Sequence, residues 1–202
     1  MTDNLQLSEL EQDLLTELFN LGVGNAAASL STMVKQEIKL SVPQVEFLSV
    51  QKLAEKLGSE NSICSVSQIV SGPFTAQSML LFPEENSLVI VRKLMGEDLP
   101  DDTIEELQKE AFSEIGNIVL NACIGSFSNA VNKEFKLDLP VFELAKPDKL
   151  FNTPDNNNGT ALFIRIHLTL SESKITGYMA FLMGTLSLEQ LKAMLTRMLE
   201  SI

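Results

Sequence analysis

The sequence predicts an α/β fold of the α+β type: one duplicated, pseudo-two-fold domain with two related helices on a mixed, mainly antiparallel sheet. Three observations support this prediction. Two long segments have apolar residues at helical spacing, runs with strand character follow each of them, and the second half repeats residues of the first. We expect residues 1–202 to form a single domain, with internal repeats over 8–98 and 103–202.

The first half is expected to begin with a helix. Ser8 and Glu11 have the spacing of a capping box, and leucines then recur at helical spacing from Leu10 to Leu21. The runs that follow are rich in apolar and β-branched residues or have helical spacing. A strand, a short helix, two strands and a helix are expected in that order over 45–50, 51–57, 62–70, 73–82 and 84–95.

The second half is expected to repeat this order after a linker, 96–102, that is too short to let the halves separate. Thr103 and Glu106 have the spacing of a second capping box, and apolar residues follow at helical spacing as far as Ile118. Turn residues are expected over 155–159. The three strands and the final helix are expected over 141–144, 160–170, 175–183 and 187–199, with a loop that contains Lys149 and Leu150 after the first strand.

The two halves share residues at a constant offset. Sliding residues 13–45 onto 110–142 without a gap aligns Glu17 with Glu114, Asn20 with Asn117 and Pro43 with Pro140. Further identities occur at Ser29, Ser31, Val34, Glu37, Lys39 and Leu40 and their counterparts. So many ungapped identities indicate an internal duplication.

Each long helix has a polar stripe, because positions i, i+4 and i+7 share one face. The stripes consist of Asp13, Glu17 and Asn20 in the first helix and Glu110, Glu114 and Asn117 in the second. A solvated surface is the usual interpretation of such a stripe. Asparagine is a poor helix former, however, and both halves keep Glu and Asn while the surrounding surface differs. We therefore expect a functional site on each helix.

The small residues of these helices have two interpretations. They allow close packing of helix on helix or helix on sheet, which we favour for most of them. Gly22 and Gly116 lie beside the asparagines, where a missing side chain would let the backbone of a partner approach. We include both among the candidate binding residues.

Charge and composition exclude several functions. The net charge of −12 opposes binding to nucleic acid or to an anionic membrane surface. Because the sequence has neither a signal-peptide pattern nor an apolar run long enough to span a bilayer, we expect a cytoplasmic protein. Cys64 and Cys123 are expected to be reduced, half-buried thiols, and His167 a core or edge residue of a strand. The sequence has no pattern typical of a metal site, a catalytic triad or a phosphate-binding loop.

The pattern Asp-x-x-x-Glu-x-x-Asn, followed after 22 residues by Pro, resembles the signature of the CheC, CheX and FliY phosphatases of bacterial and archaeal chemotaxis. Both copies fit it, with Glu110 where the family usually has Asp or Ser. Length, duplication and element order are similar to CheC, since CheX carries one motif per chain and FliY adds a flagellar switch domain. The resemblance implies a hydrolase of two-component signalling that removes the phosphoryl group from a phosphoaspartate of the response regulator CheY.

The resemblance also implies roles for the stripe residues and for partners. Asn20 and Asn117 are expected to orient the attacking water, and Glu17 and Glu114 to pair with a lysine of the regulator. Asp13 and Glu110 are expected to help bind it. The magnesium ion is expected on the regulator, and no cofactor is expected on this chain. The family also binds the deamidase CheD, which is a second candidate partner.

Two other functions remain open. A non-catalytic binding module would sequester phosphorylated regulator or act as a CheD adaptor, although sequestration alone does not require a water-orienting amide twice. A structural or flagellar-assembly protein would be related by fold only. Accelerated loss of phosphate from the regulator distinguishes the phosphatase from both.

Overall fold

The computed structural model describes residues 7–58, 61–95, 100–151, 159–170 and 173–200. The first half contains α1 (Glu9–Val34), β1 (Ile38–Ser49), α2 (Val50–Leu57), β2 (Ile63–Ser71), β3 (Ala76–Pro83) and α3 (Glu84–Met95). The second contains α4 (Asp101–Val131), β4 (Lys136–Leu137), β5 (Val141–Ala145), α5 (Pro147–Phe151), β6 (Thr160–Leu170), β7 (Ser173–Met183) and α6 (Thr185–Glu200). Linker residues 96–99 and turn residues 155–158 lie outside the described residues. Within the described ranges, no helix is long and apolar enough to cross a membrane.

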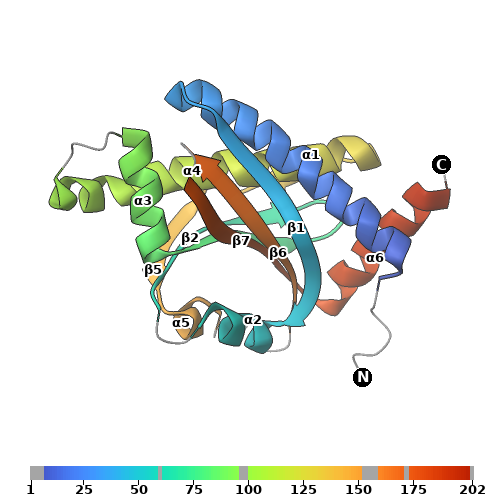
Figure 1. The fold of residues 1–202 in the computed structure, drawn as a ribbon. Helices are drawn as coiled ribbons and strands as arrows, with labels where there is room; N and C mark the ends of the chain where they lie inside the picture. The colour runs from blue at the N-terminus through green and yellow to red at the C-terminus, as the bar shows by residue number, and fades with distance from the viewer. Residues whose placement is uncertain (1–6, 59–60, 96–99, 152–158, 171–172, 201–202) are drawn as a thin grey trace.

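The strands form one sheet in which the two halves of the chain are interleaved (Figure 1). The strand order is β1-β6-β7-β3-β2, with β4 and β5 both paired to β2. The first strand of each half therefore lies at an edge, beside the hairpin of the other half. All strand pairs of the described residues are antiparallel, so the mixed sheet that the sequence predicts is antiparallel here. Neither half has a complete sheet of its own.

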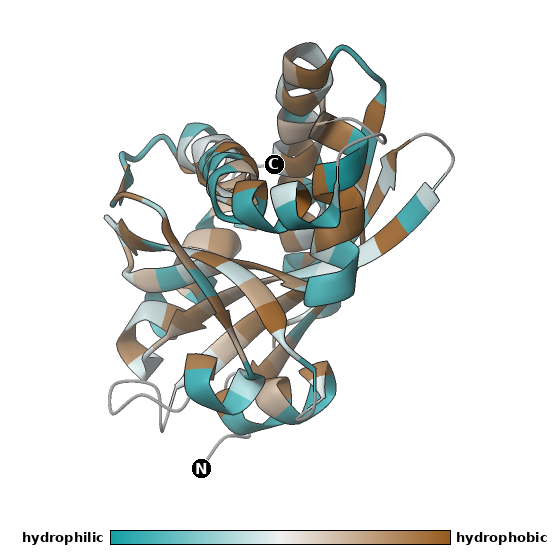
Figure 2. Ribbon diagram, turned by 90° about the vertical axis from the view of Figure 1, so that its left-hand side faces the viewer, coloured by the Kyte–Doolittle hydropathy of each residue, from teal (hydrophilic) through white to brown (hydrophobic). Residues whose placement is uncertain are grey.

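Helices cover both faces of the sheet, and successive side chains of a strand point to opposite faces, so each strand contributes to two cores. In β3, Leu80 and Phe82 pack in the main core with α1, α3, α4 and α6. Met79 and Leu81 pack in a smaller core with α2 and α5. Figure 1 shows α2 and α5 together below the sheet and α1 and α4 above it. In Figure 2 much of the hydrophobic colouring falls on the strands between these layers, while the helices carry both colours.

The first predicted capping box is confirmed and the second is wrong. Ser8 N donates to Glu11 Oε2 (2.8 Å), and Glu11 N donates to Ser8 Oγ (3.3 Å). Glu11 is buried, and its Oε1 also accepts from Thr196 Oγ1 of α6 (2.7 Å). Helix α4 begins earlier than Thr103 predicts, at Asp101, and its N-cap Pro100 makes no side-chain hydrogen bond.

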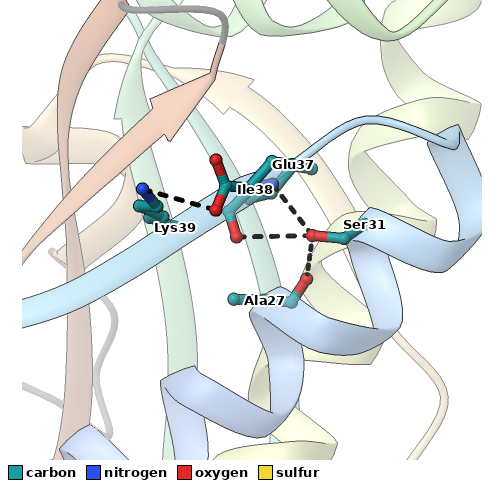
Figure 3. Close-up of polar contacts among 5 residues, drawn as sticks. All are labelled: Ala27, Ser31, Glu37, Ile38 and Lys39. Carbon is teal, nitrogen blue, oxygen red and sulfur yellow. Dashed lines mark hydrogen bonds and ion pairs between the residues drawn. The ribbon is translucent and has the colours of Figure 1, made fainter.

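The ends of the two long helices show what two of the repeated residues do. Ser31 Oγ donates to Ala27 O (2.7 Å) and accepts from Ile38 N (2.8 Å), which fixes the start of β1 against α1 (Figure 3). Its counterpart Ser128 donates to Lys133 O (2.5 Å) in the loop after α4. The helix caps Lys35 and Asn132, also 97 positions apart, both have left-handed backbone conformations. The identity of Ser31 and Ser128 therefore has a structural explanation.

Helix α1 packs on α4 at Gly22, and α4 packs on β2 at Gly116. A Cβ added to Gly22 would lie 2.6 Å from Cys123 Cα, and one added to Gly116 would lie 2.4 Å from Val66 Cγ1 of β2. The space beside each glycine is therefore filled by this chain, and the prediction that Gly22 and Gly116 admit the backbone of a partner is wrong. The alternative interpretation, close packing, is confirmed at both positions.

The two cysteines are fully buried rather than half-buried. Cys64 has 0% and Cys123 1% of its surface exposed. Burial raises the pKa of each thiol to about 12, so that the reactive thiolate does not form near neutral pH. Both are structural residues of the main core.

The helix crossing gives a stability prediction with a matched control. Gly22→Ala should destabilise the protein by about 1–3 kcal/mol, because a backbone atom of α4 occupies the place of the new methyl group. Gly24→Ala, on the exposed side of the same helix with nothing within 4 Å of the new Cβ, should stabilise it by roughly 0.5–1 kcal/mol. Urea unfolding measures both, and equal effects would contradict the packing.

Candidate functional site

The proline of the first motif lies at a bulge in β1. Ser41 lies opposite His167 of β6 and Gln44 opposite Arg165, so that residues 42 and 43 together face the single residue Ile166. Pro43 has no N–H to donate to the strand ladder. A bulge of this kind leaves backbone groups without their usual strand partner.

Asn20 bonds the backbone at this bulge. Its Oδ1 accepts from Val42 N (3.0 Å), and its Nδ2 donates to Val42 O at the longer distance of 3.4 Å. Nδ2 also donates to Thr16 O, one turn earlier in α1 (3.1 Å). The side chain of Asn20 is therefore half-buried and its amide is bonded at both ends to this chain.

The second motif has a bulge at the same place. Val70 of β2 pairs with Leu137 of β4, and Asp138 N donates to Ile69 O (3.0 Å). The pairing of β2 with β5 resumes at Ser67 and Val141. Residues 139 and 140 therefore face the single residue Gln68. Both prolines of the signature lie in bulges, 97 residues apart.

Asn117 reaches its bulge through another side chain. Its Oδ1 accepts from Gln68 Nε2 (3.2 Å) and from Asn121 Nδ2 (2.7 Å). Gln68 Nε2 also donates to Asp138 O (2.9 Å), and thus connects Asn117 to the strand. Within the described residues, Nδ2 of Asn117 has no hydrogen bond. Oδ1 of Asn117 is therefore bonded to this chain, and its Nδ2 is available to donate to a ligand.

The acids of both stripes are at the surface. Each asparagine is half-buried at the end of its stripe, and none of the four acids forms an ion pair with a described residue. Asp13, Glu17, Glu110 and Glu114 are all exposed. The structure thus places each predicted set of three residues together on one helix face, where a partner protein can reach the carboxylates.

The surroundings of the two asparagines differ. Val42, beside Asn20, is 4% exposed, whereas its counterpart Leu139 is 86% exposed. Val141, the first residue of β5, is also 59% exposed. The second bulge therefore presents an apolar surface that the first bulge buries.

Other titratable groups offer no alternative site. In the part of the chain that the structure describes, no three His, Cys, Asp or Glu side chains gather where they could hold a metal ion. His167 is half-buried in β6, with Nδ1 3.4 Å from Thr176 Oγ1. Burial and the positive charges of Lys174 and Arg165 lower the pKa of His167 below its usual value, so the imidazole is neutral near pH 7.

Residues 10–46, which contain the first motif, match the model of the CheC-like family. The CheY-P phosphatase CheC of Bacillus subtilis is 27% identical over 139 residues, which are 66% of this chain and 64% of that protein. The chain is therefore similar to CheC around its first motif. The alignment thus spans less than two thirds of the length of that relative.

Solved structures have the same fold as this chain. The crystal structure of Thermotoga maritima FliY has a TM-score of 0.74 at 20% identity and covers 95% of this chain and 98% of its own. CheX in the CheX-CheY-BeF3-Mg²⁺ complex of Borrelia burgdorferi has a TM-score of 0.52 at 19% identity, with 83% of this chain and 97% of its own covered. The predicted fold class is therefore confirmed.

Sequence reasoning missed the residues that hold the asparagines in place. Gln68 is the one long polar side chain of β2, whose other polar residues are serines, and its burial in a strand is a signal of a special role. Nothing in the sequence, however, places it against Asn117, which is 49 positions away. Asn121 lies one turn after Asn117 on α4 and could have been found from helical spacing.

The two asparagines should differ in their contribution to stability. Asn20→Ala leaves the Val42 backbone groups unpaired and should lower the free energy of unfolding by about 1–3 kcal/mol. Asn117→Ala should cost less than about 1 kcal/mol, because Gln68 keeps its bond to Asp138 O. Asn20→Asp keeps the acceptor for Val42 N but removes the donor to Thr16 O and Val42 O, so it separates the two sets of contacts. Urea unfolding measures the free energy of unfolding of each variant. Equal losses in the two alanine variants would contradict these contacts.

Proposed function

We propose that this chain hydrolyses the phosphoaspartate of a CheY-like response regulator in chemotaxis signalling. The observation that carries the proposal is the amide of Asn117, which is half-exposed, oriented through its oxygen and aligned with the exposed Glu114 on one helix face. The CheY-P phosphatase CheC that the chain resembles supports the same substrate. The CheX that shares its fold was crystallised with CheY, which supports the same kind of partner.

The reaction needs positioning more than a strong base. A phosphoaspartate is an acyl phosphate with a good leaving group, and phosphoryl transfer passes through a loose transition state. The oxygen of water attacks phosphorus while the bond to the acyl oxygen breaks, which yields the aspartate carboxylate and inorganic phosphate. An amide N–H that donates to the water oxygen holds it in line and leaves a second lone pair directed at phosphorus.

The acids have a docking role in this proposal. Glu17 and Glu114 are one helical turn before their asparagines and would pair with a lysine of the regulator, and Asp13 and Glu110 extend the same acidic surface. The net charge of −12 favours encounter with a basic rim of the regulator. The regulator would bind the magnesium ion. This chain would act on the regulator in the cytoplasm.

The first site favours a second function. Both ends of the Asn20 amide are already bonded to this chain, so its donor group is less available than that of Asn117. Helix α1 would then bind phosphorylated regulator, or serve as a CheD adaptor, without hydrolysis at that site. Binding of the regulator that does not shorten the lifetime of its phosphoryl group would support the non-catalytic function for the whole chain.

Aspartate variants test the catalytic role of the amides. Asn→Asp keeps the Oδ1 acceptor at each site and removes the N–H donor, so that the folded fraction of N20D/N117D should lose roughly a hundredfold or more of the acceleration. N117D alone should lose more activity than N20D, since the donor of Asn20 is already bonded. The measurement is the decay of labelled phospho-regulator.

The control is Asn129→Asp, which adds the same charge at an exposed asparagine of α4 outside the stripe. It should leave the decay rate unchanged. A double variant as active as N129D would contradict the proposed mechanism.

A further inference from the structure

We infer that Gln68 is a positioning residue that fixes the orientation of the Asn117 amide, an inference that rests on the proposed function. Gln68 lies in β2 opposite the Pro140 bulge and is 3% exposed. It is the buried connection between the asparagine of α4 and the edge of the sheet. No residue of the signature predicts this role.

The hydrogen bonds determine which way the amide of Asn117 faces. Asp138 O is a backbone carbonyl and can only accept, so the atom of Gln68 that reaches it at 2.9 Å is the donor Nε2. The same Nε2 lies 3.2 Å from Asn117, and its partner there must therefore be the acceptor Oδ1. A backbone carbonyl of the bulge thus sets the orientation of Gln68, and Gln68 sets that of Asn117, which leaves Nδ2 to donate to a ligand.

This arrangement destabilises the fold locally. Oε1 of Gln68 is buried and has no hydrogen-bond partner among the described residues. Opposite the bulge of the first motif lies Ile166 of β6, which is 1% exposed and has no polar side-chain atom. A glutamine in this place is therefore not required to form the bulge. Residues that weaken a core in this way are typical of functional sites.

Asn121 also bonds Asn117, but it cannot replace Gln68. It lies on the same helix as Asn117, one turn later, and is exposed. A solvent-exposed amide that moves with α4 holds Asn117 less firmly than a buried side chain bonded to β2 and to the bulge. Gln68 therefore connects the position of Asn117 to the sheet rather than to its own helix.

Gln68→Leu in an Asn20→Asp background isolates the second site. The variant should lower kcat by roughly ten- to a hundredfold and change KM by less than about twofold, because the amide is still present but no longer held in place. Its melting temperature should change little, since the loss of the bond to Asp138 O is offset by removal of the unpaired Oε1. Ser67→Ala, on the opposite face of the same strand, is the control and should leave kcat unchanged. A merely structural Gln68 would instead lower the melting temperature and leave kcat of the folded fraction unchanged, which would overturn the inference.

The order of the Asn117 side chain gives a readout that does not require activity. Relaxation of its side-chain NH2 group by NMR should show a rigid amide in the unmodified chain and a mobile one in Q68L. An amide that is equally rigid in both would overturn the inference. If the unmodified chain fails to accelerate phosphate release while Q68L still loosens Asn117, the proposed function fails and the positioning role stands.

Discussion

A bulge in each edge strand is the constraint on which the geometry of both motifs depends. A proline cannot donate to the strand ladder, and two residues then face one residue of the neighbouring strand. The helix before the strand lies close enough for an asparagine to reach this region. The interval of 22 residues between the asparagine and the proline of each motif therefore matches the path from the helix face through the helix end and back along the strand.

The interleaved sheet keeps these helices in place. The first strand of each half pairs with the hairpin of the other, and both faces of the sheet are covered by buried side chains. Helices α1 and α4 lie on the same face and approach closely at Gly22 and Cys123. Because the apolar residues of both helices pack against the sheet and against each other, the acidic stripes lie at the surface.

The duplicated motifs use their asparagines differently. Asn20 replaces missing strand partners of Val42 directly, which gives a structural reason for its presence in α1. Asn117 does not bond the strand backbone itself, because Gln68 donates both to Asn117 and to Asp138 O at the bulge. Two identical residues at equivalent positions therefore do not make two equivalent sites. Buried Val42 and exposed Leu139 show the same divergence at the bulges themselves.

The sequence by itself determined the fold class, most of the elements in their order and the residues that share each polar stripe. It did not predict β4, and residues 149 and 150, expected in a loop, lie in α5. Periodicity and capping depend on neighbours within a few positions, so Ser8 and Glu11 predicted the start of α1 correctly. The start of α4 at Asp101 and the burial of Gly22 and Gly116 did not follow from local patterns. Only the tertiary structure decided which backbone or side chain lies against each asparagine, because the sheet brings Gln68 and Asp138 together from positions 70 residues apart.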